Sequence, residues 1–150
     1  RDEDLVERGE GPTHGTAFVQ LVLLAVAAGI GRAVVDDAVR YVRTRTRVFS
    51  HGLADTAARD PLVQETVGEL AALSFGVDAA LGRAVAALTH SGAAIANGAP
   101  VAHDAVSATE AATTRAQLVI LPAVLRASTE LFEVGGASAL ANGLALDRHW

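Results

Sequence analysis

The stretch from Pro61 to Ser91, PLVQETVGELAALSFGVDAALGRAVAALTHS, decides the fold class. Its large apolar side chains recur every three or four residues, at Val63, Val67, Leu70, Leu73, Val77, Leu81, Val85 and Leu88. This period is that of an α-helix with one apolar face, and its regularity predicts that the helix packs against other helices. Asp60 and Pro61 precede the pattern as an expected N-cap and first helical residue.

Two further long helices are expected on either side of this stretch. The first runs from Thr16 to about Val48, and its apolar positions are Phe18, Leu21, Val22, Ala25, Ala28, Val35, Val39 and Val42. The other runs from about Ala102 to Val134 and is rich in alanine. It contains Pro122, which should kink the helix or shift its register. Gly135 and Gly136 should end it, and a short final helix is expected from Ser138 to about Leu146.

These elements together predict an all-α protein, because no segment shows the alternating pattern of a strand. Three long helices and a short C-terminal one suggest an up-and-down four-helix bundle. Residues 1–14 are polar and interrupted by glycine and proline, so they are interpreted as a linker from a preceding portion of a longer protein. Residues 15–150 form the expected helical-bundle domain.

The composition of the chain argues against several classes of function. With 150 residues, of which 51% are hydrophobic, the chain suits one globular domain. The net charge of −5 argues against nucleic-acid binding, and the absence of cysteine excludes disulfides and thiolate metal sites. The apolar run from Ala17 to Ile30 is shorter than the ~20 residues of a membrane span, which favours a buried core helix. The five histidines lack metal-binding spacing, so no metal site is expected.

Four arginines near the end of the first helix are candidates for anion binding. Arg40, Arg43 and Arg47 share one stripe, and Asp36 is placed to pair with Arg40. Arg45 falls roughly 140° from Arg40 on the helical wheel, toward the side that should be buried. A guanidinium there needs an anionic partner, which is either an internal carboxylate or the phosphate of a bound nucleotide; otherwise it must reach solvent at the helix end.

The step Gly135-Gly136-Ala137-Ser138 also has two interpretations. Gly135 and Gly136 can serve as an ordinary helix C-cap. Ser138 would then start the final helix, whose free N–H groups and hydroxyl could hold a phosphate.

These residues resemble the C-terminal helical domain of the acyl-CoA dehydrogenase superfamily. Tyr41, Arg45 and Phe49 are similar to a Tyr, Arg and aromatic set that ends the matching helix, although Phe49 lies one residue further along than in the dehydrogenases. The tail Asp147-Arg148-His149-Trp150 is similar to the Asp-Arg-x-Trp of the dibenzothiophene monooxygenase branch. His149 is a candidate acid or base, or equally an orienting or interface residue.

The resemblance implies a flavin, FMN or FAD, bound across a subunit boundary. Its cofactor-binding residues would be Arg45, Phe49, Gly135, Gly136 and Ser138, in a homo-oligomer that is typically a tetramer. No catalytic residue is assigned, because Phe18 to Leu23, where some dehydrogenases carry the catalytic glutamate, contains no carboxylate.

The function implied is the C-terminal domain of a cytoplasmic flavin-dependent monooxygenase. Such an enzyme would use reduced flavin from a partner reductase, O₂, and an aromatic or organosulfur substrate that is hydrophobic. The fragment alone should be inactive. One alternative is the same domain of an acyl-CoA dehydrogenase that oxidises acyl-CoA thioesters. A second alternative, which composition and periodicity alone permit, is a helical scaffold with no enzymatic activity.

Overall fold

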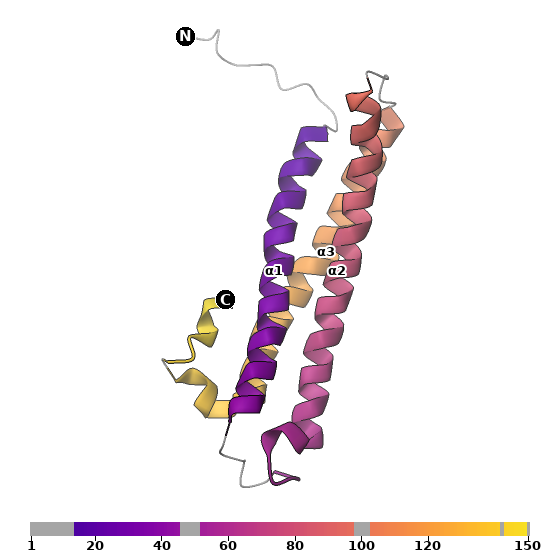
Figure 1. The fold of residues 1–150 in the computed structure, drawn as a ribbon. Coiled ribbons are helices and arrows are strands. Elements are labelled where there is room, and N and C mark those ends of the chain that lie inside the picture. The colour runs from indigo at the N-terminus through magenta and orange to yellow at the C-terminus, as the bar shows by residue number, and fades with distance from the viewer. Residues whose placement is uncertain (1–13, 46–51, 98–102, 142, 150) are drawn as a thin grey trace, which may run out of the picture.

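The structure is a computed structural model, and it describes residues 14–45, 52–97, 103–141 and 143–149. Three long helices dominate it: α1 (His14–Thr44), α2 (Pro61–Ala96) and α3 (His103–Gly135). Figure 1 shows them as a bundle in which consecutive helices run in opposite directions. The described residues also form short 3-10 helices, which are η2 (Ala57–Arg59), η3 (Gly136–Leu140) and η4 (Leu146–His149). The described residues include no strand, which confirms the all-α prediction.

The buried face of α2 follows a seven-residue repeat. Its buried residues are Val63, Leu70, Val77, Ala84 and Ser91, each seven positions after the one before. A seven-residue repeat is typical of helices that pack nearly parallel or antiparallel to their neighbours. Val85, expected in the core, is 43% exposed, and Ala84 is fully buried in its place. The expectation was wrong because a pattern of large side chains overlooks an alanine where two helices approach closely.

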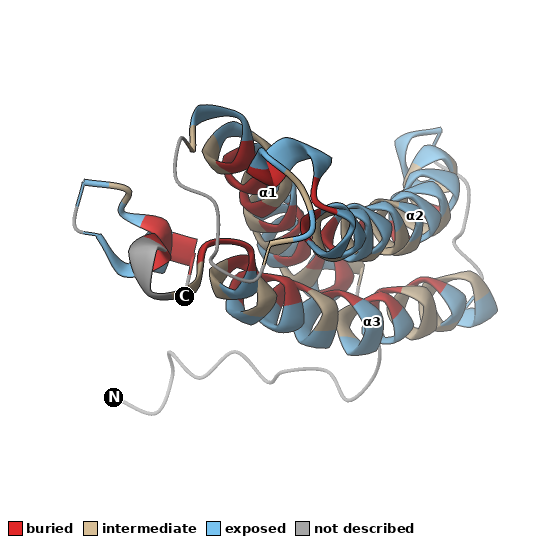
Figure 2. Ribbon diagram, turned by 90° about the horizontal axis from the view of Figure 1, so that it is seen from below, coloured by how far each residue is buried: buried red, intermediate tan, exposed pale blue. Residues whose placement is uncertain are grey.

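The face that α1 buries differs from the predicted one. Its buried apolar residues are Ala17, Leu21, Leu24, Ala28, Val34, Ala38 and Val42. Phe18, Val22 and Ala25 were expected in the core and are exposed. Nearly every residue from Ala17 to Ile30 is apolar, so the sequence pattern could not distinguish one face from another. Figure 2 shows buried segments on the inward side of the helices and exposed segments outside.

Small and hydroxylated side chains fill the contact between α2 and α3. Thr109 and Thr113 are buried on α3, and Ser91 is buried on α2. The Thr109 hydroxyl lies 2.9 Å from the Ala105 carbonyl oxygen and 3.1 Å from the Ser91 hydroxyl. Because these groups satisfy one another, their burial avoids the penalty of an unpaired polar group. Pro122 lies on the exposed face of α3, which continues through it as one helix.

Ion pairs on the exposed surface of the bundle add little to its stability. Arg32 on α1 forms two hydrogen bonds to Oδ1 of Asp78 on α2, at 3.0 and 2.7 Å. The pKa of Arg32 is raised, mainly by the hydrogen bond with Asp78 and next by the negative charge of that carboxylate. Both side chains are well exposed, so the pair is screened by solvent and contributes little to stability.

The predicted short final helix is wrong. Residues 136–140 and 146–149 form two short 3-10 helices, and Ala145, just before the second, has a positive φ of 46°. A segment this short gains little from helix formation alone, and Gly143 weakens it further. The fold is therefore a three-helix bundle with a returning tail, and the tail contacts α1 and α3. Leu146 and Ala139 of this tail are buried in the core.

Asp60 joins the loop before α2 to the start of that helix. Its side chain is buried, and its two oxygens accept hydrogen bonds from the N–H groups of Leu53 and Leu62, both at 3.0 Å. We predict that Asp60→Ala lowers the free energy of unfolding by about 1–2 kcal/mol, because a buried N-cap is lost. Thermal denaturation measures this change. The matched control is Asp55→Ala, in the same loop but exposed, and an equal loss in the two variants would contradict the prediction.

Candidate functional site

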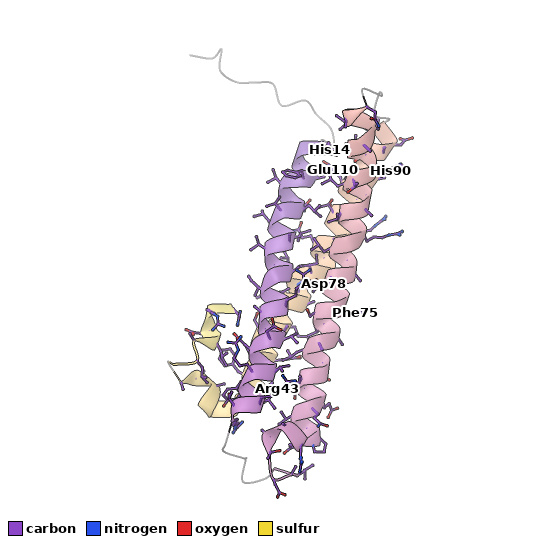
Figure 3. The ribbon with its side chains drawn as sticks, viewed as in Figure 1. His14, Arg43, Phe75, Asp78, His90 and Glu110 are labelled. Atoms are coloured by element: carbon purple, nitrogen blue, oxygen red, sulfur yellow. The ribbon has the colours of Figure 1, made fainter. Side chains whose placement is uncertain are left out.

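One stripe of α1 faces the returning tail. It consists of Asp37, Tyr41 and Arg45, which are spaced four residues apart and so lie on one side of the helix. Arg45 follows the last residue of α1 directly. Figure 3 places the neighbouring Arg43 near the lower end of the bundle and His14 and Glu110 near the other end. The predicted cofactor contacts on α1 and at the glycine step are therefore at the same end of the molecule.

The guanidinium of Arg45 lies against the end of α3. Its Nη1 donates a hydrogen bond of 3.3 Å to the carbonyl oxygen of Val134. Its central carbon lies 5.7 Å from the centre of the Tyr41 ring, within the range of a cation–π contact. Arg45 is half-buried. Its position is therefore intermediate between the two considered from the sequence, a buried guanidinium and one that reaches solvent at the helix end.

Internal packing accounts for both glycines of the step. A Cβ added at Gly135 would lie 2.6 Å from the Cβ of Ala139 and 2.8 Å from Cε1 of Tyr41, so this position admits no side chain without movement. Gly136 has a φ of 54°, the left-handed conformation common just after a helix end. The C-cap interpretation is thus sufficient for Gly136, and close approach to Tyr41 is sufficient for Gly135.

All five predicted cofactor contacts stay predictions, including those of Phe49 and Ser138. Phe49 lies outside the described residues. Ser138 lies inside η3 and does not begin an α-helix, so the helix N-terminus expected to favour an anion there is not formed. Any phosphate contact of Ser138 would have to come without that contribution.

The donors at this corner are suited to an anion such as a phosphate. A guanidinium can form two parallel hydrogen bonds to phosphate oxygens, and its charge strengthens them. Arg45 provides that group in a half-buried setting, where charges are screened less than in open water. The chemistry of these donors is therefore compatible with a phosphate group.

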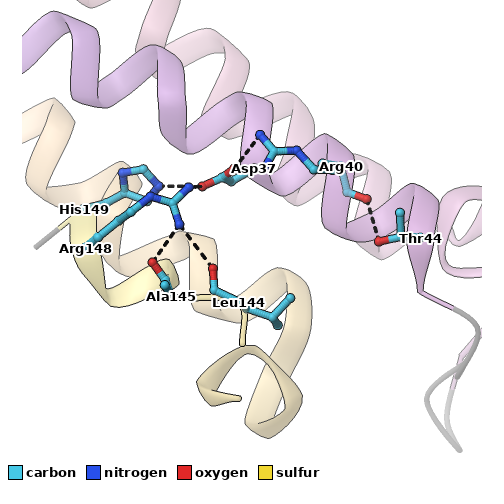
Figure 4. A network of polar contacts seen from close by, with 7 residues as sticks. All are labelled: Asp37, Arg40, Thr44, Leu144, Ala145, Arg148 and His149. Carbon is cyan, nitrogen blue, oxygen red and sulfur yellow. Dashed lines mark hydrogen bonds and ion pairs between the residues drawn. The ribbon is translucent and has the colours of Figure 1, made fainter. Parts of the chain in front are cut away.

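A buried carboxylate near this corner was missed from the sequence. Asp37 is 4% exposed and receives three cationic or polar side chains (Figure 4). Nη2 of Arg40 lies 2.8 Å from its Oδ1. Nε2 of His149 lies 2.8 Å from its Oδ2, and Arg148 pairs with the same oxygen. Asp37 thereby ties the tail to α1.

This network corrects the expected partner of Arg40 and shows the surroundings of His149. Arg40 pairs with Asp37 and not with Asp36, which is exposed, because Asp37 is the residue on the side facing the tail. The carboxylate partner of His149 is Asp37, and the histidine is buried between α1 and α3. A signal was present: Asp37 precedes Tyr41 by four residues and Arg45 by eight, on the stripe already singled out.

A groove of about 520 Å³ between α2 and α3 lies away from the corner. It is lined mainly by alanines, with Arg83, His90 and Arg115 among them. In Figure 3, His90 lies near the end of the bundle opposite Arg43. No predicted site residue lines this groove, so it is separate from the predicted flavin contacts.

Comparison with known families identifies the domain. A family model described as "Acyl-CoA dehydrogenase, C-terminal domain" matches residues 21–150. The chain belongs to this family. The match includes all five predicted cofactor-binding residues and the tail, and it confirms the resemblance found in the sequence.

Solved structures show the same fold in monooxygenases. Methanesulfinate monooxygenase MsuC from Pseudomonas fluorescens superposes with a TM-score of 0.80 at 27% identity, over 88% of this chain. Dibenzothiophene monooxygenase TdsC from Paenibacillus sp. A11-2 gives a TM-score of 0.76 at 24% identity, over 90%. Its FMN-bound form gives 0.79. At that identity, the likeness to TdsC concerns the fold.

The domain spans about a third of these structures, since the match covers 33% of each of their chains. A search of curated proteins gave no match. Length and composition alone would allow α1 and α2 to cross a membrane, but the core helices of soluble proteins pass the same test.

Proposed function

We propose that this domain is the C-terminal part of a flavin-dependent monooxygenase and that it supplies flavin phosphate binding and subunit contacts. The observation that carries the proposal is the Arg45 guanidinium, half-buried at the end of α1 against the glycine corner. Membership of the acyl-CoA dehydrogenase family and the likeness to MsuC at 27% identity support it.

In this proposal Arg45 binds the phosphate of FMN or FAD, and Phe49, Gly135, Gly136 and Ser138 surround it. FMN is the first choice because a TdsC structure contains it. When bound, a reduced flavin supplies the electrons that activate O₂. The task of this domain is to hold and orient that cofactor through its phosphate.

An exposed apolar face on α1 supports subunit contacts. Phe18, Val19, Val22, Leu23 and Val26 are each 48% exposed or more, and they lie within nine residues of one helix. Soluble proteins rarely leave so dense an apolar patch in water, so we infer that protein covers it. A homo-oligomer, with a tetramer as the expected form, would cover this face and bring Arg45 to the flavin of a neighbouring subunit.

The proposed substrate is a hydrophobic aromatic or organosulfur compound. TdsC is described as a dibenzothiophene monooxygenase, and one of its structures contains bound indole. MsuC is described as a methanesulfinate monooxygenase. We further propose a separate flavin reductase as the electron source and the cytoplasm as the location.

The reaction can be tested against the alternative of an acyl-CoA dehydrogenase, which the family name also supports. We predict that the full-length protein, given reduced FMN and a thioether or aromatic substrate, consumes O₂ and forms oxygenated product. Ferricenium reduction with acyl-CoA thioesters is the parallel assay. Activity in the second assay alone would reject the monooxygenase in favour of the dehydrogenase. A protein that binds no flavin and shows neither activity would favour the scaffold.

A further inference from the structure

The tail is attached to the bundle most firmly at His149. Its imidazole Nε2 lies 2.8 Å from Asp37 of α1, and its carbonyl oxygen accepts a 3.0 Å hydrogen bond from Ser128 of α3. Asp37, Ser128 and His149 are all less than 9% exposed. One residue of the tail is thus held by two helices, through its side chain and its main chain.

Arg148 reinforces this attachment. Its Nη2 pairs with Asp37, while its Nη1 donates to the carbonyl oxygens of Leu144 and Ala145 at 3.2 and 2.8 Å. The guanidinium therefore also stabilises the turn that leads into η4, where Ala145 has its positive φ (Figure 4). Asp37 is the common acceptor, so removal of its charge would weaken the attachment of both tail residues together.

The same stripe of α1 contacts the corner one and two turns further on. Tyr41 packs against Gly135, and Arg45 donates to the carbonyl oxygen of Val134. Asp37 thus holds the tail at His149, and Tyr41 packs against the end of α3, where the tail begins. Between these points, Ala139 and Leu146 are buried in the core.

We propose that Asp37 is a positioning residue: by holding Arg148 and His149 it keeps the tail on α1, and through the tail it maintains the corner at which Arg45 binds the flavin phosphate. Asp37 itself does not contact the cofactor. The attachment of the tail stands on the observed contacts alone, whereas its effect on flavin binding rests on the proposed function.

The test uses Asp37→Asn in the full-length protein. This variant keeps the size of the side chain but replaces the charged acceptor with an amide, which weakens its bonds to Arg148 and His149. We expect amide hydrogen exchange in residues 143–149 to accelerate at least about tenfold, with exchange in the middle of α2 unchanged. FMN binding, with FAD in parallel, should weaken about tenfold.

The matched control is Asp36→Asn, which removes the neighbouring exposed carboxylate and should change neither measurement. Ser128→Ala gives an independent variant, because it removes the hydrogen bond to the His149 carbonyl oxygen from the opposite side. It should also accelerate exchange in the tail while Asp37 is intact. Unchanged tail exchange in Asp37→Asn would overturn the proposal, as would equal acceleration throughout α2.

A double variant shows whether Asp37 acts through Arg45. If it does, Asp37→Asn combined with Arg45→Ala binds FMN no more weakly than Arg45→Ala alone, because the contact that Asp37 maintains is already absent. Additive losses would overturn a positioning role that acts through Arg45. If Arg45→Ala alone leaves FMN binding unchanged, the proposed phosphate contact fails, and the exchange measurements still decide the attachment of the tail.

Discussion

Replacing Gly135 with alanine is expected to lower the free energy of unfolding by about 2–3 kcal/mol, the upper part of the range for an overpacked core. The added Cβ would lie 2.6 Å from the Cβ of Ala139 and 2.8 Å from Tyr41. The first of these is a methyl group attached directly to the backbone, so it cannot rotate away. Either η3 or the Tyr41 ring must move. Thermal and denaturant unfolding of the protein measures the loss.

The chain offers a matched control for this substitution. Gly82 is an exposed residue of α2, and a Cβ added there meets nothing within 4 Å. Gly82→Ala should therefore stabilise the protein by about 0.5–1 kcal/mol, because alanine favours a helix more than glycine does. Equal effects of the two substitutions would show that Gly135 is kept for a reason other than close packing.

Replacing Arg45 with alanine is expected to weaken flavin binding by about thirtyfold, or about 2 kcal/mol, the size of a lost hydrogen bond to a charged group. The substitution removes the guanidinium that lies against Val134 and Tyr41 at the corner. Fluorescence titration of the full-length oligomer with FMN and FAD measures the affinity. Higher salt should reduce the difference between wild type and variant, because screening weakens the phosphate contact.

Arg43→Ala is the matched control, since Arg43 lies exposed in the last turn of the same helix. It should bind flavin as the wild type does. Arg45→Lys should be intermediate, because lysine keeps the charge but cannot form the two parallel hydrogen bonds of a guanidinium. If Arg43→Ala weakens binding as much as Arg45→Ala, the effect is general surface charge, and the specific contact is refuted.

The three long helices were predictable because their apolar residues recur with the helical period over thirty residues or more. Asp60 and Pro61 also marked the start of α2 correctly. The buried face was predictable only where polar residues alternate with apolar ones. In the first half of α1 almost every side chain is apolar, so Phe18 and Leu24 could not be distinguished, although only Leu24 is buried.

The tail and the charged network could not be predicted from local pattern. Residues 136–149 are held by contacts to α1 and α3 and not by helix propensity, so a helix was expected where the chain forms two 3-10 turns. Asp37 and His149 are separated by more than a hundred residues in sequence, and only the fold brings them to 2.8 Å. The sequence did identify Arg45 and the glycine step, which lie at the same corner.

The central claim is that Arg45 binds a flavin phosphate that belongs to a neighbouring subunit, and a structure of the full-length oligomer with FMN tests it most directly. We expect a phosphate oxygen within hydrogen-bonding distance of the Arg45 guanidinium, with the isoalloxazine ring held by the other subunit. A phosphate bound elsewhere, with the Arg45 guanidinium still donating to the carbonyl oxygen of Val134, would rule out this contact.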